Sequence, residues 1–392
     1  MRLVQRTPSV LRLGRARATR YGWRHTWPGL STDRFPLIRI SETGGAERTG
    51  ELVTLAAKQS VWLPGPVPFD GLPIELTDVR PQGFLGRHFA GMHPDLGLPP
   101  SVSDWSDHHV LLALSRRGED MTGNLIVGEE SFQRWQALPY DDIPRTEFDR
   151  LADAALAGHP PGSSAGGERP KFGVFSHGRH VLVKFAGRGA SDSAAGRWSD
   201  LLVLEVLALT VAAQHGLATA RTELVQSERH TFLESERFDR VARKGRRAVR
   251  SLAAVSGDPS TTWSAAAVLL QEHGRLSRED ASRLRWLDAF GALIGNTDRH
   301  QYNVAFFRGT AESLTLAPAF DLVPMFYAPA ADGRVLADAL PPARQTADTL
   351  DVWADARAAA HEFWRRASDD RRISEDLRRA AAVNVERLRR DV

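Results

Sequence analysis

Cysteine is absent from this chain of 392 residues. That absence excludes a disulfide framework, a zinc site built on thiolates and a cysteine nucleophile. Long apolar runs are absent too, because the most apolar stretch, residues 201–213, is too short to span a membrane and contains Glu205. The arginine-containing N-terminus has no apolar segment of the kind that signal peptides need. We therefore expect a cytoplasmic globular protein of two or three domains, without a membrane partner.

Lysine is scarce, and the acidic residues are unevenly distributed. Of the 51 basic residues only Lys58, Lys171, Lys184 and Lys244 are lysines, and residues 1–30 contain seven arginines and no acid. The net charge is +3, so the chain beyond this leader carries −4. A cationic leader suits the phosphate backbone of DNA, although a solvated tail would have the same composition.

Apolar periodicity and turn signals predict an α+β chain with a strand-rich N-terminal half and a helical C-terminal half. Residues 157–170 are predicted to form a loop, and residues 236–240 would lie at the cleft between two lobes. Strands are expected at residues 35–40, 50–55, 171–175, 180–185, 222–225 and 231–234. Helices are expected from an N-cap at Ser199 to a stop at Gly216, from Ser277 to Ile294, and twice in the arginine-rich C-terminal segment.

The first chemical motif is the loop Ser163-Ser-Ala-Gly-Gly-Glu-Arg-Pro-Lys171. Gly166 and Gly167 would let backbone N–H groups approach a polyphosphate, and Lys171 would add a positive charge. A flexible linker would have the same composition, so this motif depends on the others.

A second motif joins two isolated charges in apolar surroundings. Lys184 lies in the middle of an apolar strand, and Glu205 is the only charged residue of an otherwise apolar helix, residues 201–214. A buried, unpaired charge is costly, so the two residues would stabilise each other as an ion pair. Protein kinases use such a pair to hold the phosphates of the nucleotide. An edge-strand lysine that reaches solvent is the alternative.

The third motif is Gly295-Asn-Thr-Asp-Arg-His-Gln-Tyr-Asn303, followed by two short strands and Asp321. A hairpin would return Asp321 to the loop that holds Asp298 and Asn303. Asp298 could then accept the proton of an attacking hydroxyl, while Asn303 and Asp321 could bind Mg²⁺ that bridges the phosphates of ATP. We expect His300 to orient Asp298 or the loop backbone. A polar turn with a capping aspartate is the alternative.

Together these motifs resemble the HipA family of bacterial toxin kinases over most of residues 35–392. The resemblance implies a bilobal protein-kinase-like fold and transfer of the γ-phosphate of ATP to a protein serine or threonine, in some members on an aminoacyl-tRNA synthetase. It implies a catalytic base at Asp298, Mg²⁺ ligands at Asn303 and Asp321, phosphate binding by Lys184, an adenine-binding hinge from Glu236 to Phe238, and autophosphorylation at Ser163 or Ser164. Tyr302 departs from the family, which commonly has a lysine there.

The N-terminal part resembles single-chain members of this family that begin with a winged helix-turn-helix. Residues 5–13 resemble its recognition helix and residues 14–22 its wing, so Arg15, Arg17 and Arg20 are candidate DNA contacts. The earlier helices of such a module are missing, so we expect either a truncated module, with the gene start set too late, or a degenerate one. The predicted domains are a remnant of this module at residues 1–30, a HipA N-terminal subdomain at 31–145, a kinase-like N-lobe at 146–245 and a helical C-lobe at 246–392.

Three hypotheses follow for the function. The first is an ATP- and Mg²⁺-dependent protein serine/threonine kinase of a toxin–antitoxin system, with a protein substrate and an antitoxin as partners. The second is a DNA-binding regulator whose kinase body is inactive and whose N-terminal arm binds an operator. The third is a metal-dependent nuclease built on Asp298, His300, Asn303 and Asp321. A small-molecule kinase would share the phosphate-binding residues of the first.

Overall fold

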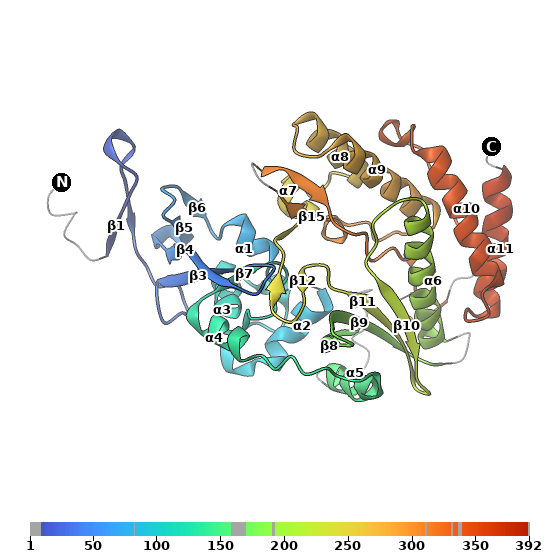
Figure 1. The fold of residues 1–392 in the computed structure, drawn as a ribbon, viewed down its shortest axis with the longest axis horizontal. Helices are drawn as coiled ribbons and strands as arrows, with labels where there is room; N and C mark the ends of the chain where they lie inside the picture. Colours follow the sequence, from blue (N-terminus) through green and yellow to red (C-terminus); the bar gives the residue numbers. More distant parts are fainter. Residues whose placement is uncertain are drawn as a thin grey trace. The chain divides into compact units, whose positions relative to one another are not determined.

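The computed structural model describes residues 9–81, 83–157, 170–189, 193–309, 312–330, 332–335 and 339–390. The chain folds into two compact units, whose elements are labelled in Figure 1. The first unit comprises Met1–Asp141 together with Asp239–Ala248, and the second comprises Asp142–Phe238 and Val249–Val392. No helix in the described ranges is both long and apolar enough to cross a membrane.

The first unit is built on a five-stranded antiparallel sheet in the order β6-β5-β4-β3-β7. Strand β3 is covered on both faces, because Phe35 and Leu37 enter one apolar cluster while Ile38 and Ile40 enter another. The elements of this unit are β1 (Val10–Leu13), β2 (Arg20–Trp23), β3 (Arg34–Ile40), β4 (Ala46–Thr54), β5 (Gln59–Leu63), β6 (Pro68–Asp70), α1 (Ile74–Asp78), α2 (Gly83–Met92), α3 (Asp107–Arg117), β7 (Leu125–Val127), α4 (Glu129–Ala137), β12 (Arg240–Val241) and β13 (Gly245–Arg246).

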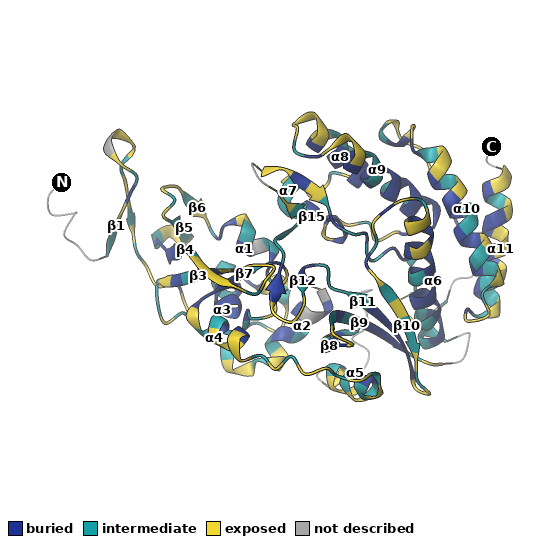
Figure 2. Ribbon diagram, viewed as in Figure 1, coloured by how far each residue is buried: buried dark blue, intermediate teal, exposed yellow. Residues whose placement is uncertain are grey.

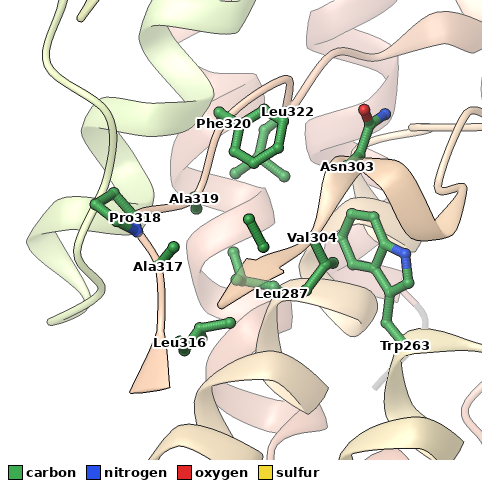
Figure 3. A pocket seen from close by; sticks show the side chains of 11 residues that line it. Trp263, Leu287, Asn303, Val304, Leu316, Ala317, Pro318, Ala319, Phe320 and Leu322 are labelled. Carbon is green, nitrogen blue, oxygen red and sulfur yellow. The ribbon is translucent and has the colours of Figure 1, made fainter. Parts of the chain in front are cut away.

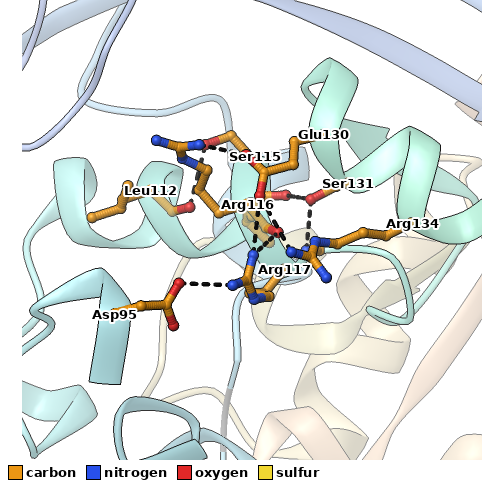
Figure 4. A network of polar contacts seen from close by, with 10 residues as sticks. Asp95, Leu112, Ser115, Arg116, Arg117, Glu130, Ser131 and Arg134 are labelled. Atoms are coloured by element: carbon orange, nitrogen blue, oxygen red, sulfur yellow. Dashed lines mark hydrogen bonds and ion pairs between the residues drawn. The ribbon is translucent and has the colours of Figure 1, made fainter. Parts of the chain in front are cut away.

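A polar network joins the C-terminal end of α3 to α4 (Figure 4). The Ser131 hydroxyl accepts a hydrogen bond from the Gly118 N–H and donates one to the Leu114 carbonyl, both over 2.8 Å. The Arg117 guanidinium donates to Glu130 Oε1 over 3.0 Å and to Asp95 Oδ2 over 2.7 Å. The two Ser131 bonds satisfy backbone groups at the C-terminal end of α3, and the Arg117 bonds are ion pairs between side chains.

Strands β1 and β2 form an antiparallel hairpin ahead of the main sheet. The prediction of a recognition helix over residues 5–13 is therefore wrong for Val10–Leu13, which form a strand; residues 5–8 lie outside the described ranges. Leu13 explains the difference, since it is buried in a cluster with Val53, Leu55 and Val61 of the sheet, and an extended strand pairs with β2 while reaching them.

The second unit begins with α5 (Phe148–Leu156) and a four-stranded antiparallel sheet in the order β10-β11-β9-β8. Its strands are β8 (Lys171–Ser176), β9 (Arg179–Gly187), β10 (Thr222–Gln226) and β11 (His230–Glu236), close to the predicted positions. Helix α6 (Ala194–Gln214) packs against β9 and β11 and is buried along most of its length (Figure 2). The predicted N-cap at Ser199 is wrong: Ser193 caps the helix by accepting from the Gly196 N–H, and Ser199 donates to the Thr231 hydroxyl from within the helix.

The remainder of the second unit is mainly helical, as predicted. Helix α9 begins at its predicted N-cap, Ser277, whose hydroxyl accepts from the Asp280 N–H. Helix α10 packs against α6, α9 and α11, and Phe363 and Trp364 of α10 are fully buried there. The elements are β14 (Val249–Ser251), α7 (Leu252–Ser256), α8 (Trp263–Glu272), α9 (Arg278–Leu293), β15 (Ala305–Arg308), β16 (Leu314–Leu316), α10 (Trp353–Asp369) and α11 (Glu375–Arg390).

Candidate active site

Lys184 lies at the centre of the site, between two carboxylates. Its Nζ donates to Glu205 Oε1 over 2.7 Å and to Asp321 Oδ1 over 2.6 Å. The Lys184 and Glu205 side chains are only 6% and 1% exposed, whereas Asp321 is partly exposed. The ion pair predicted from the two isolated charges is thus present. The contact with Asp321 was not predicted, because no local pattern links residues 137 positions apart.

Lys171 lies directly opposite Lys184 in the register of β8 and β9. Opposite residues of an antiparallel pair point to the same face, and two like charges in that relation repel. Glu205 and Asp321 offset the charge of Lys184. The proposed loop residues Ser163, Ser164, Gly166 and Gly167 lie outside the described ranges.

Asp321 reaches Lys184 because of the hairpin that follows the loop of Asp298. Strand β15 pairs with β16 and with β14 in an antiparallel three-stranded sheet. Asp321 itself adopts a left-handed backbone conformation with φ of 58°. Non-glycine residues rarely adopt this conformation, which costs on the order of 1 kcal/mol and is concentrated at functional sites.

The side chains of the loop from Asp298 to Asn303 point in turn toward solvent and toward the protein interior. The side chains of Asp298 and His300 are 51% and 49% exposed, and Tyr302 is also exposed. Gln301 and Asn303 are buried. His300 Nε2 lies 3.9 Å from Asp298 Oδ2, so the imidazole is beside the carboxylate without a hydrogen bond to it.

Buried side chains hold this loop in place. Gln301 Nε2 donates to the carbonyls of Asp258 and Thr261 over 2.7 and 2.8 Å, and Gln301 Oε1 accepts from the Ser256 hydroxyl over 2.8 Å. The Trp263 indole N–H donates to the His300 carbonyl over 3.2 Å. Sequence reasoning did not assign a role to Gln301; its only signal was a place between His300 and Asn303 in the motif.

The Asn303 side-chain amide is bonded to the loop through its nitrogen. Its Nδ2 donates to the Asp298 carbonyl over 3.0 Å, which directs Oδ1, the atom that can bind a metal, away from that contact. Mg²⁺ is usually held by one or two protein oxygens together with substrate phosphates and water, and Asn303 and Asp321 carry side-chain oxygens of that kind. Three or more His, Asp or Glu side chains in one metal-binding group do not occur among the described residues.

A small apolar pocket lies behind Asn303 and the segment that leads to Asp321 (Figure 3). Trp263, Leu287 and Phe320 form part of its wall, and Phe320 directly precedes Asp321 in the chain. Phe320 also lies 5.6 Å, ring to ring, from Phe238 at the end of the predicted hinge. This apolar packing supports the backbone on which the metal-binding candidates lie.

The hinge candidate Glu236 belongs to a network of ion pairs on the sheet. Arg145 binds the buried Glu234 through two hydrogen bonds of 2.7 Å, and Arg179 lies 3.7 Å from Glu234 and 3.3 Å from Glu236. Hydrogen bonds to Glu234 and Glu223 raise the pKa of the Arg145 guanidinium. The network fixes the Glu236 carboxylate at the end of β11.

The structure thus brings the predicted kinase residues together in two directly bonded groups within the second unit. Lys184, Glu205 and Asp321 form one group, and Asp298 and Asn303 form the other. The candidate DNA contacts belong to the first unit, where Arg15, Arg17 and Arg20 are exposed on the hairpin.

Comparison with known proteins identifies relatives along the whole chain. A family model described as the HipA-like C-terminal domain matches residues 163–387, and one described as the YjjJ-like toxin, middle domain, matches residues 31–136. Toxin YjjJ of Escherichia coli strain K12 is 36% identical over 412 residues, covering 99% of this chain and 91% of that protein.

Two solved structures are also similar. HipA of Shewanella oneidensis, solved with HipB and its operator DNA, superposes with a TM-score of 0.53 at 15% identity, over 91% of this chain and 97% of that one. The Helicobacter pylori proinflammatory kinase CtkA gives a TM-score of 0.39 at 13% identity, over 57% of this chain and 90% of that one. The similarity to HipA confirms the predicted α+β, bilobal kinase-like fold. The chain belongs to the HipA-like toxin family and is of the YjjJ type.

Proposed function

We propose that this protein is an ATP- and Mg²⁺-dependent kinase that transfers the γ-phosphate to a serine or threonine of another protein. One observation carries the proposal: a buried lysine is bonded to a helix glutamate and to an aspartate that follows the Asp298 loop. Burial of both charges has a desolvation cost, and a strand lysine paired with a helix glutamate is the arrangement with which protein kinases hold the nucleotide phosphates.

Each residue has a task that fits its surroundings. Lys184, which is ion-paired with Glu205, would bind the phosphates of ATP, with Lys171 beside it on the same face. Asp298 is exposed, so its carboxylate can reach the hydroxyl of a large acceptor and take its proton. The segment from Glu236 to Phe238 would meet the adenine.

Mg²⁺ would be held by Asn303 Oδ1 and the Asp321 carboxylate. When bound, the ion would neutralise charge on the phosphates. The backbone contact from Asn303 Nδ2 to the Asp298 carbonyl ties the ligand-bearing side chain to the residue that would act as base. The two tasks therefore depend on one loop geometry.

Binding of a fluorescent ATP analogue with Mg²⁺ tests the nucleotide site. Wild-type protein should bind it, and Lys184→Met should weaken binding at least tenfold. Lys58→Met is the matched control, because Lys58 is an exposed lysine of the first unit. Equal binding by wild type and Lys184→Met would contradict the role of Lys184.

By analogy with its relatives, we propose toxin action on a cellular protein and control by an antitoxin. YjjJ is named a toxin, and the HipA structure contains HipB and operator DNA. Induced expression should therefore arrest growth in wild-type form and not as Asp298→Asn. Growth arrest by both forms would separate toxicity from the proposed chemistry.

DNA binding by the β1–β2 hairpin is a second candidate function. Arg12, Arg15, Arg17 and Arg20 are exposed on it, and no ion pair joins them to a carboxylate within the described part of the chain. Exposed Trp23 adds a ring on the same hairpin. Unpaired guanidinium groups favour phosphate backbones, and each contact contributes about 0.9 to the salt dependence of the logarithm of the binding constant.

A duplex-binding titration across salt concentrations tests this candidate. Replacing the four arginines by alanine should reduce the slope of that dependence by as much as about 3.6. The control replaces Arg371 of the second unit, which is exposed as well. An unchanged slope in the fourfold variant would exclude the hairpin as a DNA contact.

A further inference from the structure

Arg299 is held between the Asp298 loop and helix α9. Its Nε donates to Asp288 Oδ1 over 2.9 Å, and its Nη1 donates to the carbonyl of Asn296. Asp288 also accepts from both the backbone N–H and the hydroxyl of Ser264, in the first turn of α8. The carboxylate of Asp288 therefore joins the start of one helix, the middle of another and the loop.

Gly291 of α9 leaves the space that the Arg299 side chain occupies. A Cβ atom at this position would lie 2.8 Å from Arg299 Cδ, closer than two carbon atoms can pack. Glycine weakens a helix relative to alanine, so its presence inside α9 is not explained by helix stability. It is explained by the passage of the arginine.

Asn296 links Arg299 to Asp298, because it is hydrogen-bonded to both residues. Asn296 is buried, and its N–H donates to the Gly291 carbonyl over 2.8 Å. Its carbonyl accepts from Arg299, and its Oδ1 accepts from the Asp298 N–H over 3.0 Å. Asn296, two positions before Asp298, and Arg299, directly after it, are thus both bonded to α9.

We propose that Arg299 is a positioning residue that sets the direction of the Asp298 carboxylate through Asn296, with Asp288 and Gly291 as its supports. This inference rests on the proposed function, in which Asp298 is the base. Arg299 touches neither nucleotide nor acceptor in this account. Its loss should consequently lower kcat and leave nucleotide binding intact, since misplacement of a reacting group by about 1 Å can cost a factor of about 100.

The test is the initial rate of ADP formation from Mg²⁺·ATP by the full chain, with a serine or threonine of the chain itself, or water, accepting the γ-phosphate. Arg299→Ala should lower kcat roughly tenfold to a hundredfold, with the KM for ATP within about twofold of wild type. Arg299→Lys should recover part of the loss, because one ammonium group can contact Asp288 or the Asn296 carbonyl but reproduces neither geometry in full. A loss of folding would lower the apparent kcat by reducing the fraction of active protein, so the melting temperature of each variant is measured alongside, and a wild-type melting temperature assigns the lower kcat to misplacement of Asp298.

Gly291→Ala provides the second variant. It should lower kcat at least threefold without lowering the melting temperature, because alanine favours the helix while its Cβ displaces Arg299. Combined with Arg299→Ala, it should cause no further loss. Additive losses in the double variant would overturn the proposed link between the two residues.

Arg283→Ala is the matched control, because it removes another ion-paired arginine of α9, bonded to Glu279 and Asp280. An active wild type with an unchanged kcat in Arg299→Ala would overturn this inference alone. A wild type that forms no ADP would overturn the proposed function, and the inference with it.

Discussion

Replacement of Lys184 by methionine should destabilise the second unit strongly. The change keeps the length of the side chain and removes its charge, which leaves Glu205, 1% exposed in helix α6, without its partner at 2.7 Å. Removal of one member of a buried ion pair costs about 3–5 kcal/mol. Loss of the second contact adds little, because the Asp321 side chain is 29% exposed and can be hydrated.

The expected loss is a large part of the stability of a typical domain, about 5–15 kcal/mol. For a unit of this size it corresponds to a fall in melting temperature of roughly 6–20 °C. Scanning calorimetry or circular dichroism measures it, with Lys58→Met as a control that should change nothing. A fall corresponding to less than about 1 kcal/mol would refute the buried-pair reasoning.

A double variant separates stability from activity. Lys184→Met with Glu205→Met replaces the pair by two apolar side chains, which is often neutral or stabilising. The melting temperature should return to near the wild-type value, while ATP binding should stay weak because the lysine is still missing. Recovery of binding in the double variant would show that the ion pair serves the fold only.

Two further predictions concern pH. Burial raises the pKa of Glu119, whose Oε2 has no hydrogen-bond partner among the described residues. Because the pKa is raised in the folded state, the ionised carboxylate lowers the free energy of unfolding above about pH 4. Glu119→Gln should therefore raise the melting temperature at pH 7 and leave it unchanged at pH 4. A lower melting temperature of Glu119→Gln at pH 7 would contradict this. The second group is Asp149 on α5. Burial tends to raise the pKa of its carboxyl, but hydrogen bonds with His230 and Ser227 outweigh burial and lower this pKa. Asp149→Asn should therefore destabilise at pH 6 and progressively less as the pH falls below about 4, whereas a constant effect would exclude the ionised carboxylate as its cause.

The Lys184–Glu205 pair could be predicted from the sequence because each charge interrupts an apolar segment. A buried charge requires a partner, and the sequence contains few other candidates nearby. The Asp321 contact could not be predicted in detail, since it depends on the left-handed backbone at Asp321 and on the β15–β16 hairpin. Likewise, nothing in the pattern predicts that Asp239–Ala248 belongs to the first unit.

The errors in the sequence analysis have local physical causes. Apolar periodicity begins at Leu201, which made Ser199 the nearest capping residue, but small residues after Ser193 allow α6 to begin earlier. The segment from Val10 to Leu13 forms a strand because tertiary packing of Leu13 and pairing with β2 decide its conformation. Both cases show packing overriding a local signal.

Transfer of labelled phosphate from γ-labelled ATP to protein tests the central claim most directly. Wild-type protein with Mg²⁺ should label itself or a protein of a cell lysate on serine or threonine. Asp298→Asn should reduce the rate by a factor of about 100 or more, as expected for loss of a general base, while Asp369→Asn, an exposed carboxylate at the end of α10, should match wild type. Equal labelling by wild type and Asp298→Asn, or no labelling by wild type, would contradict the account.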